Sequence, residues 1–347
     1  MHCRRHGKRL DTALFAVSRT RHHHAPARAR LIWLVWLAWP LFALVACSAT
    51  PDPAPTDRPY ALVLGTAQDA GLPQLGCRAL CCEAARADAS LRRLVSSVLI
   101  VDPRTDQRWL LDASPDLAEQ VELAREHAAP TAPGRPALFA GIFLTHAHLG
   151  HYTGLAELGR EAYGSEATPV WGTESLVSFI EGNGPWSLLV SAGHIETRIL
   201  PPGNTIELAP ELTISSIPVP HRDEFSDTVA YRVQGPGGAL LYLPDIDQWE
   251  RWPLPIESVL VDVEHALLDG TFFSADELPG RSIADIPHPL ISESIRRFSD
   301  LPRRERAKIH FTHLNHSNPA ATPHSPAQGA ILRAGMDIAT GGMLLPL

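Results

Sequence analysis

Residues 144–155 read LTHAHLGHYTGL, and they place His146, His148 and His151 close together in the chain. The apolar residues 138–144 have the pattern of a β-strand, and helical spacing follows. His146 and His148 are two residues apart, so an extended chain turns both rings to one side, and the turn into the helix brings His151 round. Imidazole is a good ligand for zinc, iron and copper. The stretch therefore predicts a transition-metal site, with ordinary hydrogen-bonded loop histidines as the alternative.

Short apolar runs bounded by Gly, Pro or Asp occur on both sides of these histidines and predict β-strands. Apolar residues at helical spacing alternate with them. This order predicts an α/β fold in which helices cover two sheets. The predicted strands are 60–64, 97–101, 109–111, 138–144, 197–200, 205–208, 212–218, 228–233, 239–243, 258–261 and 307–312, with a short segment at 337–345, and the predicted helices are 116–127, 154–163, 174–180 and 292–298.

The N-terminus differs from the rest of the chain. Residues 1–30 are basic and polar, whereas residues 31–46 (LIWLVWLAWPLFALVA) carry no charge. Sixteen apolar residues are fewer than the roughly 20 that a spanning helix needs, but they suit the apolar region of a signal peptide. We therefore expect residues 1–46 to be an export signal, with an uncleaved anchor helix as the alternative.

The sequence LVACS at 44–48 resembles the lipobox at which bacterial lipoproteins are cleaved and acylated. It predicts lipidation of Cys47, a Pro-rich tether over 47–59 and a folded domain over 60–347, held at the membrane and facing the periplasm. Residues 1–46 contain 8 of the 30 basic and 1 of the 38 acidic residues, which leaves residues 47–347 with a net charge of −15. Such an acidic chain disfavours nucleic acid as a partner and leaves a small molecule as the expected substrate.

The histidine loop resembles the His-x-His-x-Asp-His signature of the metallo-β-lactamase superfamily, which implies a four-layer αββα sandwich over about residues 60–345. The resemblance implies one metal on His146, His148 and His221, and a second on His151, Asp245 and His313. It also implies that Asp112 braces the metal loop. Three alternatives stay open: Asp247 or Asp269 in place of Asp245, and His316 in place of His313.

Gly150 stands where that signature has its aspartate, so one oxygen ligand of the second metal is missing. We expect one or two zinc ions, with iron as the alternative. A metal with an open position lowers the pKa of bound water to about 7 and polarises a carbonyl or phosphoryl oxygen, which predicts hydrolysis through a metal-bound hydroxide. We assign the catalytic role to Asp245 and His148.

The sequence LGTAQDAGLPQLGC at 64–77 resembles the first strand and loop of the coenzyme PQQ synthesis protein B family, as do NGPW at 183–186, LDGTFF at 268–273 and LNHSNP at 314–319. The resemblance implies a structural zinc on Cys77, Cys81 and Cys82. His324 or His288 could supply its fourth ligand, and a disulfide is the alternative because exported proteins meet oxidising conditions.

Three functions are compatible with these features. The first is an exported metal-dependent hydrolase of a small ester, amide, lactone or phosphodiester. The second, implied by the PQQ-family resemblance, is a hydroxylase or carrier of the PQQ pathway. The third is a lipoprotein that only binds its ligand, with Gly150 as a mark of lost catalysis.

Overall fold

The computed structural model describes residues 54–278, 280 and 287–347, and these belong to one compact unit. The predicted signal peptide, Cys47 and the start of the predicted tether lie outside the described residues. Within the described ranges no helix is both long enough and apolar enough to cross a bilayer.

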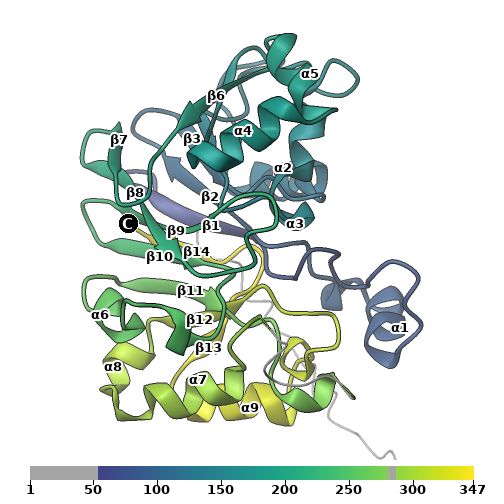
Figure 1. The fold of residues 1–347 in the computed structure, drawn as a ribbon, viewed down its shortest axis with the longest axis vertical. Coiled ribbons are helices and arrows are strands. Elements are labelled where there is room, and N and C mark those ends of the chain that lie inside the picture. The colour runs from purple at the N-terminus through teal and green to yellow at the C-terminus, as the bar shows by residue number, and fades with distance from the viewer. Residues whose placement is uncertain (1–53, 279, 281–286) are drawn as a thin grey trace, which may run out of the picture. The chain divides into compact units, whose positions relative to one another are not determined.

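The fold is built on two sheets of seven strands each, drawn as arrows in Figure 1. The first sheet has the order β14-β1-β2-β3-β4-β5-β6. Strand β2 pairs antiparallel with β1 and with β3, whereas β3, β4, β5 and β6 run parallel to one another. The bounds are β1 Tyr60–Gly65, β2 Ser97–Asp102, β3 Gln107–Leu111, β4 Gly141–Phe143, β5 Thr168–Gly172, β6 Ile195–Ile199 and β14 Leu344–Pro346.

The second sheet has the order β13-β12-β11-β10-β9-β8-β7. Strands β10 to β13 run parallel, and β7, β8, β9 and β10 alternate in direction. The bounds are β7 Thr205–Ala209, β8 Leu212–Val219, β9 Thr228–Gln234, β10 Ala239–Leu243, β11 His265–Asp269, β12 Ile309–Thr312 and β13 Asp337–Ile338. Strands β8, β10, β11 and β12 therefore point the same way, and their carboxyl ends share one edge of the sheet.

Side chains on the two faces of each sheet define three apolar layers. In β1, Ala61 and Val63 face the second sheet, where they join Tyr231 and Tyr242 in the layer between the sheets. Alternate residues of β1, such as Leu62, pack instead against the helices outside the first sheet. Because both faces of the strand are buried, its sequence is an uninterrupted apolar run. Burial of this kind stabilises by about 25 cal/mol per Å² of apolar surface removed from water.

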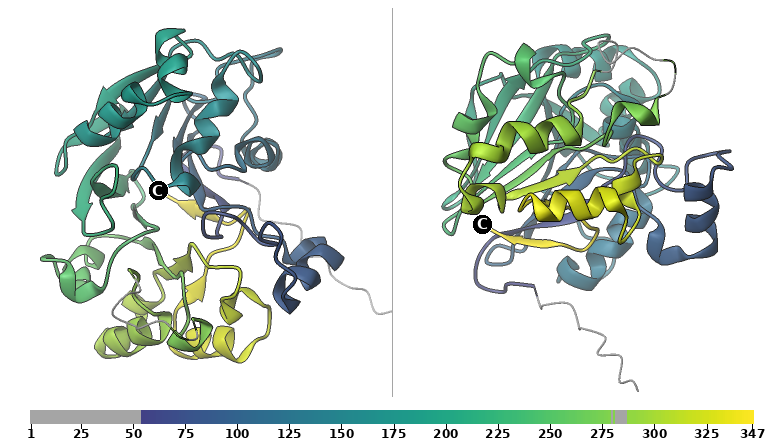
Figure 2. Two further views of the ribbon diagram at one scale, coloured as in Figure 1. Left: turned by 45° about the vertical axis from the view of Figure 1, so that its right-hand side comes forward. Right: turned by 90° about the horizontal axis from the view of Figure 1, so that it is seen from below.

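Helices cover the outer face of each sheet, which confirms the predicted αββα sandwich. The first sheet carries α2 Leu117–Ala128, α3 Leu149–Tyr152, α4 Glu174–Gly182 and α5 Trp186–Ser191, and the second carries α6 Ile256–Leu260, α7 Ile291–Arg297, α8 Arg303–Arg306 and α9 Pro326–Arg333. Figure 2 shows α7 and α9 lying across the second sheet, in yellow-green and yellow. Helix α1 Leu80–Ala87, in dark blue, lies to one side and adds Cys82 and Ala85 to the apolar layer of the second sheet.

Two predicted elements are wrong in type. Residues 258–261 were expected to form a strand, but they fall mostly in α6, which follows Pro255 and buries Ile256 and Leu260 one helical turn apart. The expected helix at 154–163 is a shorter 3₁₀ helix, Thr153–Leu158. Strands β5 and β11 and helices α5 and α9 were not predicted.

Candidate metal centre

Seven side chains converge where strands of the two sheets end. The three histidines of the loop follow β4, and Asp112 follows the neighbouring parallel strand β3. From the second sheet come His221 after β8, Asp245 after β10 and His313 after β12. Carboxyl ends of parallel strands share an edge, so the fold brings these residues together at one edge of the two sheets.

His146, His148 and His221 form the first group, and their ligand atoms lie within 4.8 Å of one another. The Nε2 atom of His146 lies 2.8 Å from Nδ1 of His148. The other nitrogen of His148, Nε2, lies 2.9 Å from the Glu224 carboxylate, and this contact orients the ring with Nδ1 toward His146. The loop histidines and the distant His221 are thus brought together as expected.

His151, Asp245 and His313 form the second group. Asp245 Oδ2 lies 3.0 Å from His151 Nε2 and 3.3 Å from His313 Nε2. Its other oxygen, Oδ1, lies 3.7 Å from His221 Nε2 of the first group. One carboxylate therefore faces both sets of imidazoles, which is the place of a bridging ligand.

The centre leaves an unusual set of buried polar atoms without a hydrogen-bond partner. Within the described part of the chain these include His151 Nε2, His221 Nε2, His313 Nε2 and Asp245 Oδ2. Buried nitrogen and oxygen atoms normally have hydrogen-bond partners, and a bound ion is one of the few explanations when several without one converge. Nitrogen and carboxylate oxygen are also the donors that zinc prefers in catalytic sites, so these residues fit the metal that the sequence implied.

Asp112 and Thr145 orient the rings of the first sheet. Buried Asp112 accepts hydrogen bonds from His151 Nδ1 at 2.8 Å, from the Thr145 amide at 2.8 Å and from the Tyr242 hydroxyl at 3.1 Å. The Thr145 hydroxyl donates to Asp112 and lies 3.0 Å from His146 Nδ1. Since Nδ1 of both histidines is engaged, Nε2 of each faces the metal group.

Asp269 and Thr271 repeat this arrangement in the second sheet. The Thr271 hydroxyl donates to Asp269 at 2.8 Å and lies 3.0 Å from His313 Nδ1. His288 donates from Nδ1 to Asp269 at 2.8 Å, and the same atom lies 3.8 Å from Asp245 Oδ1. In the sequence, Asp269 and Thr271 stand in the LDGTFF stretch at 268–273, and Asp269 was considered only as an alternative to Asp245.

Burial and neighbouring charges shift the pKa values at the centre. Burial lowers the pKa of His221 to about 4, and burial with the nearby His151 lowers the pKa of His146 well below its usual range. Burial also lowers the pKa of His151, but Asp112 and Asp245 outweigh it and raise that pKa overall. Burial raises the pKa of Asp245, yet the facing His313 and His151 bring it well below the ordinary value. The site between His151 and Asp245 therefore favours a positive charge, which a metal cation supplies.

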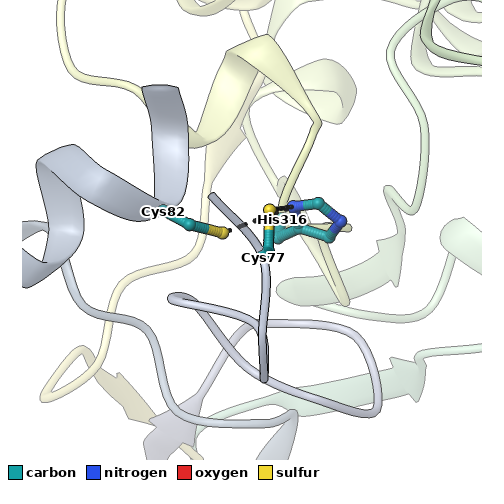
Figure 3. A group of neighbouring side chains, drawn as sticks. All are labelled: Cys77, Cys82 and His316. Carbon is teal, nitrogen blue, oxygen red and sulfur yellow. Dashed lines mark hydrogen bonds between the residues drawn. The ribbon is translucent and has the colours of Figure 1, made fainter. Parts of the chain in front are cut away.

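The three cysteines form a separate cluster around His316. Their sulfur atoms lie 3.8 Å, 3.7 Å and 3.5 Å from His316 Nδ1, for Cys77, Cys81 and Cys82 respectively. Tetrahedral zinc with zinc–sulfur bonds of about 2.3 Å sets its donors roughly 3.5–3.8 Å apart. Figure 3 shows Cys77 and Cys82 pointing toward the imidazole, with Cys82 on α1. The three cysteines are free thiols, so the alternative of a disulfide among them is not what the structure shows.

A family model described as "Beta-lactamase superfamily domain" matches residues 107–311. The chain belongs to the β-lactamase superfamily. Its relatives include the coenzyme PQQ synthesis protein B of Cupriavidus necator, 26% identical with 82% of this chain and 98% of the relative covered. The corresponding protein of Methylobacterium nodulans is 27% identical, with 83% and 99% covered. This confirms that the chain lies in the branch resembling PQQ synthesis protein B.

Solved structures show the same superfamily fold. Zinc-bound PqqB from Methylobacterium extorquens superposes with a TM-score of 0.71 at 22% identity, covering 83% of this chain and all of that one. A diphosphatase of the PhnP family superposes with a TM-score of 0.60 at 23% identity, covering 84% and 99%. At these identities the likeness concerns the fold.

The structure sorts the residues that the superfamily resemblance had left open. Asp245 faces the centre, whereas Asp247 pairs with Arg251 at 2.6 Å and Asp269 orients His288. His313 lies in the centre, and His316 lies among the cysteines. The expected fourth partner of the cysteines was therefore wrong: His288 belongs to the metal centre, and His324 is exposed.

Gly150 has a neighbour that the sequence did not reveal. A Cβ atom built on Gly150 would lie 2.3 Å from Asp69 Oδ1 and 2.8 Å from Asp69 Cα. The side chain that superfamily members carry at this position has no room here. The absence of a side chain at Gly150 therefore leaves no opening for a substrate there, because Asp69 fills the space.

Proposed function

We propose that this protein is an exported metal-dependent hydrolase of a small ester, amide, lactone or phosphodiester. The observation that carries the proposal is the convergence of imidazoles on Asp245, with Nε2 of His151, His221 and His313 facing it, buried and without a hydrogen-bond partner among the described residues. Buried aspartate and threonine side chains orient the rings of His146, His151 and His313. Metal ligands are commonly oriented by such outer partners.

The residues of the centre would bind two ions. One ion would be bound by His146, His148 and His221. The other would take part of its ligands from His151, Asp245 and His313. Bound zinc supplies Lewis acidity and makes water ionise near neutral pH. Asp245 keeps its charge at neutral pH, and the Asp112 carboxylate binds His151 Nδ1, so that Nε2 faces Asp245.

Exposed apolar side chains beside these ligands favour a substrate with an apolar part. Leu149 directly follows His148 and is 65% exposed, and Phe225 directly follows Glu224 and is 62% exposed. Phe225 packs against Phe179 of α4. Apolar side chains exposed next to such ligands are typical of a binding surface.

The direct test is hydrolysis of ester, lactone, amide and phosphodiester panels by the zinc-loaded and the metal-free protein. We expect H148A to lose at least about a thousandfold of the activity, since the ion loses a ligand. H324A is the matched control, because the His324 side chain is exposed and the variant keeps the backbone amide that donates to Gln328. Activity that survives chelation, or that H148A leaves unchanged, would remove the proposed hydrolase.

A second candidate is a function in the PQQ pathway, favoured by similarity to PQQ synthesis protein B over more than four fifths of the chain. This function would be either that of an iron-dependent hydroxylase or that of a carrier. Metal analysis separates the candidates: purified protein that holds zinc and no iron, from a host without the pathway, argues against the hydroxylase.

Export and lipid anchoring are also part of the proposal. They are supported by the uncharged residues 31–46 and by the LVACS sequence that ends the segment. The protein should sediment with membranes and should become soluble in the periplasm, or remain unprocessed, when Cys47 is replaced by alanine. A C47A protein that is processed and distributed like the natural one would contradict lipidation.

A further inference from the structure

Asp69 lies on the loop after β1, distant in sequence from every other residue of the centre. Its Oδ1 atom is buried and has no hydrogen-bond partner within the described residues, although the side chain as a whole is 41% exposed. Asp69, His151 and His313 have ligand atoms within 4.8 Å of one another. Asp69 Oδ1 lies 3.9 Å from His151 Nε2, so two unpartnered atoms face each other across a space that an ion would fill.

The loop that carries Asp69 is fixed from both sides. The amide of Gln68 donates to Leu314 at 2.9 Å, and the amide of Leu314 donates to Thr66 at 2.8 Å. On the other side the amide of Ala67 donates to Leu94 at 2.9 Å. Asp69 is therefore held beside His313 by backbone pairing, and its place does not depend on a flexible side chain reaching across solvent.

Gly150 explains why the loop can come so close. The backbone of Asp69 stands where a side chain on residue 150 would start, with its Cα 2.8 Å from the position of that Cβ. A carboxylate on residue 150 and the loop in its present place exclude each other. The chain thus carries one carboxylate at this point of the centre, and it comes from the first loop of the domain.

We propose that Asp69 is a metal ligand of the second ion, together with His151, His313 and Asp245, and that it takes the place of an aspartate at position 150. This inference rests on the proposed metal centre. A second carboxylate balances the charge of a divalent cation and supplies a hard oxygen donor, as zinc and iron sites with mixed nitrogen and oxygen ligands require. The centre is then binuclear without an aspartate in the histidine loop.

Metal binding tests this assignment independently of catalysis. The full protein, stripped of metal, is titrated with Co²⁺ while its visible absorption is recorded, and its zinc content is measured at buffered free Zn²⁺. We expect D69A and D69N to bind the second ion of the centre at least about tenfold more weakly, as loss of a ligand predicts, and to keep the first ion. D223N is the control, because Asp223 makes no hydrogen bond or ion pair with any described residue and lies in the loop after His221.

Keeping a carboxylate on the same loop sharpens the test. D69E should bind the second ion more tightly than D69A and D69N do, because it retains an oxygen donor. If D69A and D69N both titrate like the natural protein, the assignment is wrong. A protein that binds both ions through Asp69 and hydrolyses nothing supports this inference and removes the proposed activity.

Discussion

Asp112 and His313 adopt left-handed backbone conformations, with φ angles of 63° and 58°. Such conformations cost on the order of 1 kcal/mol or more in residues other than glycine and persist where the surroundings fix them. Both residues end a strand, and both take part in the network that aims imidazole nitrogen atoms into the centre. The strain therefore lies at the positions where the direction of a side chain matters most.

The first prediction concerns Asp112, which is fully buried and accepts hydrogen bonds from an imidazole, an amide and two hydroxyl groups. D112A leaves these donors unsatisfied, so the free energy of unfolding should fall by about 3 kcal/mol or more. Y242F removes one of the same hydrogen bonds and should cost about 1 kcal/mol. Urea denaturation of the metal-free proteins measures both, and equal losses would contradict the central role of Asp112.

The second prediction concerns acid and follows from the pKa of His221, which burial lowers to about 4 in the folded, metal-free protein. In the unfolded chain a histidine titrates near 6.5. Between pH 6.5 and 4 the unfolded chain therefore binds a proton that the folded protein excludes, and the free energy of unfolding falls as the pH drops. Urea midpoints of chelator-treated protein across this range should fall more steeply for the natural protein than for H221F, and parallel slopes would contradict the argument.

At the scale of elements, local pattern predicted strands well where both faces are buried, as in 60–64 and 239–243. It failed where tertiary packing decides. Residues 258–261 (SVLV) have strand-forming side chains, yet Pro255 starts a helix there and the apolar side chains of α6 pack one turn apart. Strand β11 was missed because its run is short and is completed by its parallel neighbours β10 and β12.

The same limit applies to the site. The spacing of His146, His148 and His151 is local and could be recognised from sequence. Asp69 and His316 could not be assigned, because backbone pairing between residues about 250 positions apart brings their loops together. The absence of an aspartate at 150 was visible, but only the structure shows which side chain occupies that space.

The third prediction concerns the loop from Asp69 to α1. The far end of this loop contacts His316 through the cysteine cluster. Because His316 is only three residues after His313, the cluster joins the segment of Asp69 to the segment of His313, and both carry ligands of the second ion. C77S should release zinc from the cluster and should increase backbone hydrogen exchange and proteolysis over residues 70–88. L80A on the same helix is the control, since Leu80 is 89% exposed. Unchanged exchange in C77S would show that the cluster does not fasten this loop.

At the scale of the whole domain, the centre joins the two halves of the sandwich. The first sheet supplies His146, His148 and His151, and the second supplies His221, Asp245 and His313. Apolar packing between the sheets holds these halves together along β1, β2, β9 and β10. At the centre the facing groups are imidazoles and carboxylates, several of whose buried atoms have no hydrogen-bond partner among the described residues.

The fourth prediction is that metal occupancy raises the stability of the whole domain. A ligand that binds only the folded state stabilises it by about 2.7 kcal/mol when its free concentration is a hundred times Kd. For a domain of this size each kcal/mol corresponds to roughly 2–4 °C. Tm should therefore rise by several degrees as buffered free Zn²⁺ increases. Tm of C77S should also rise with free Zn²⁺, and in this variant the cysteine cluster no longer contributes to the rise. Because the ions of the centre link the sheets, H221A in the C77S background should reduce the rise of Tm with free Zn²⁺ more than H324A does. A Tm that does not change with free Zn²⁺ would contradict this prediction, because the domain would then be equally stable without metal.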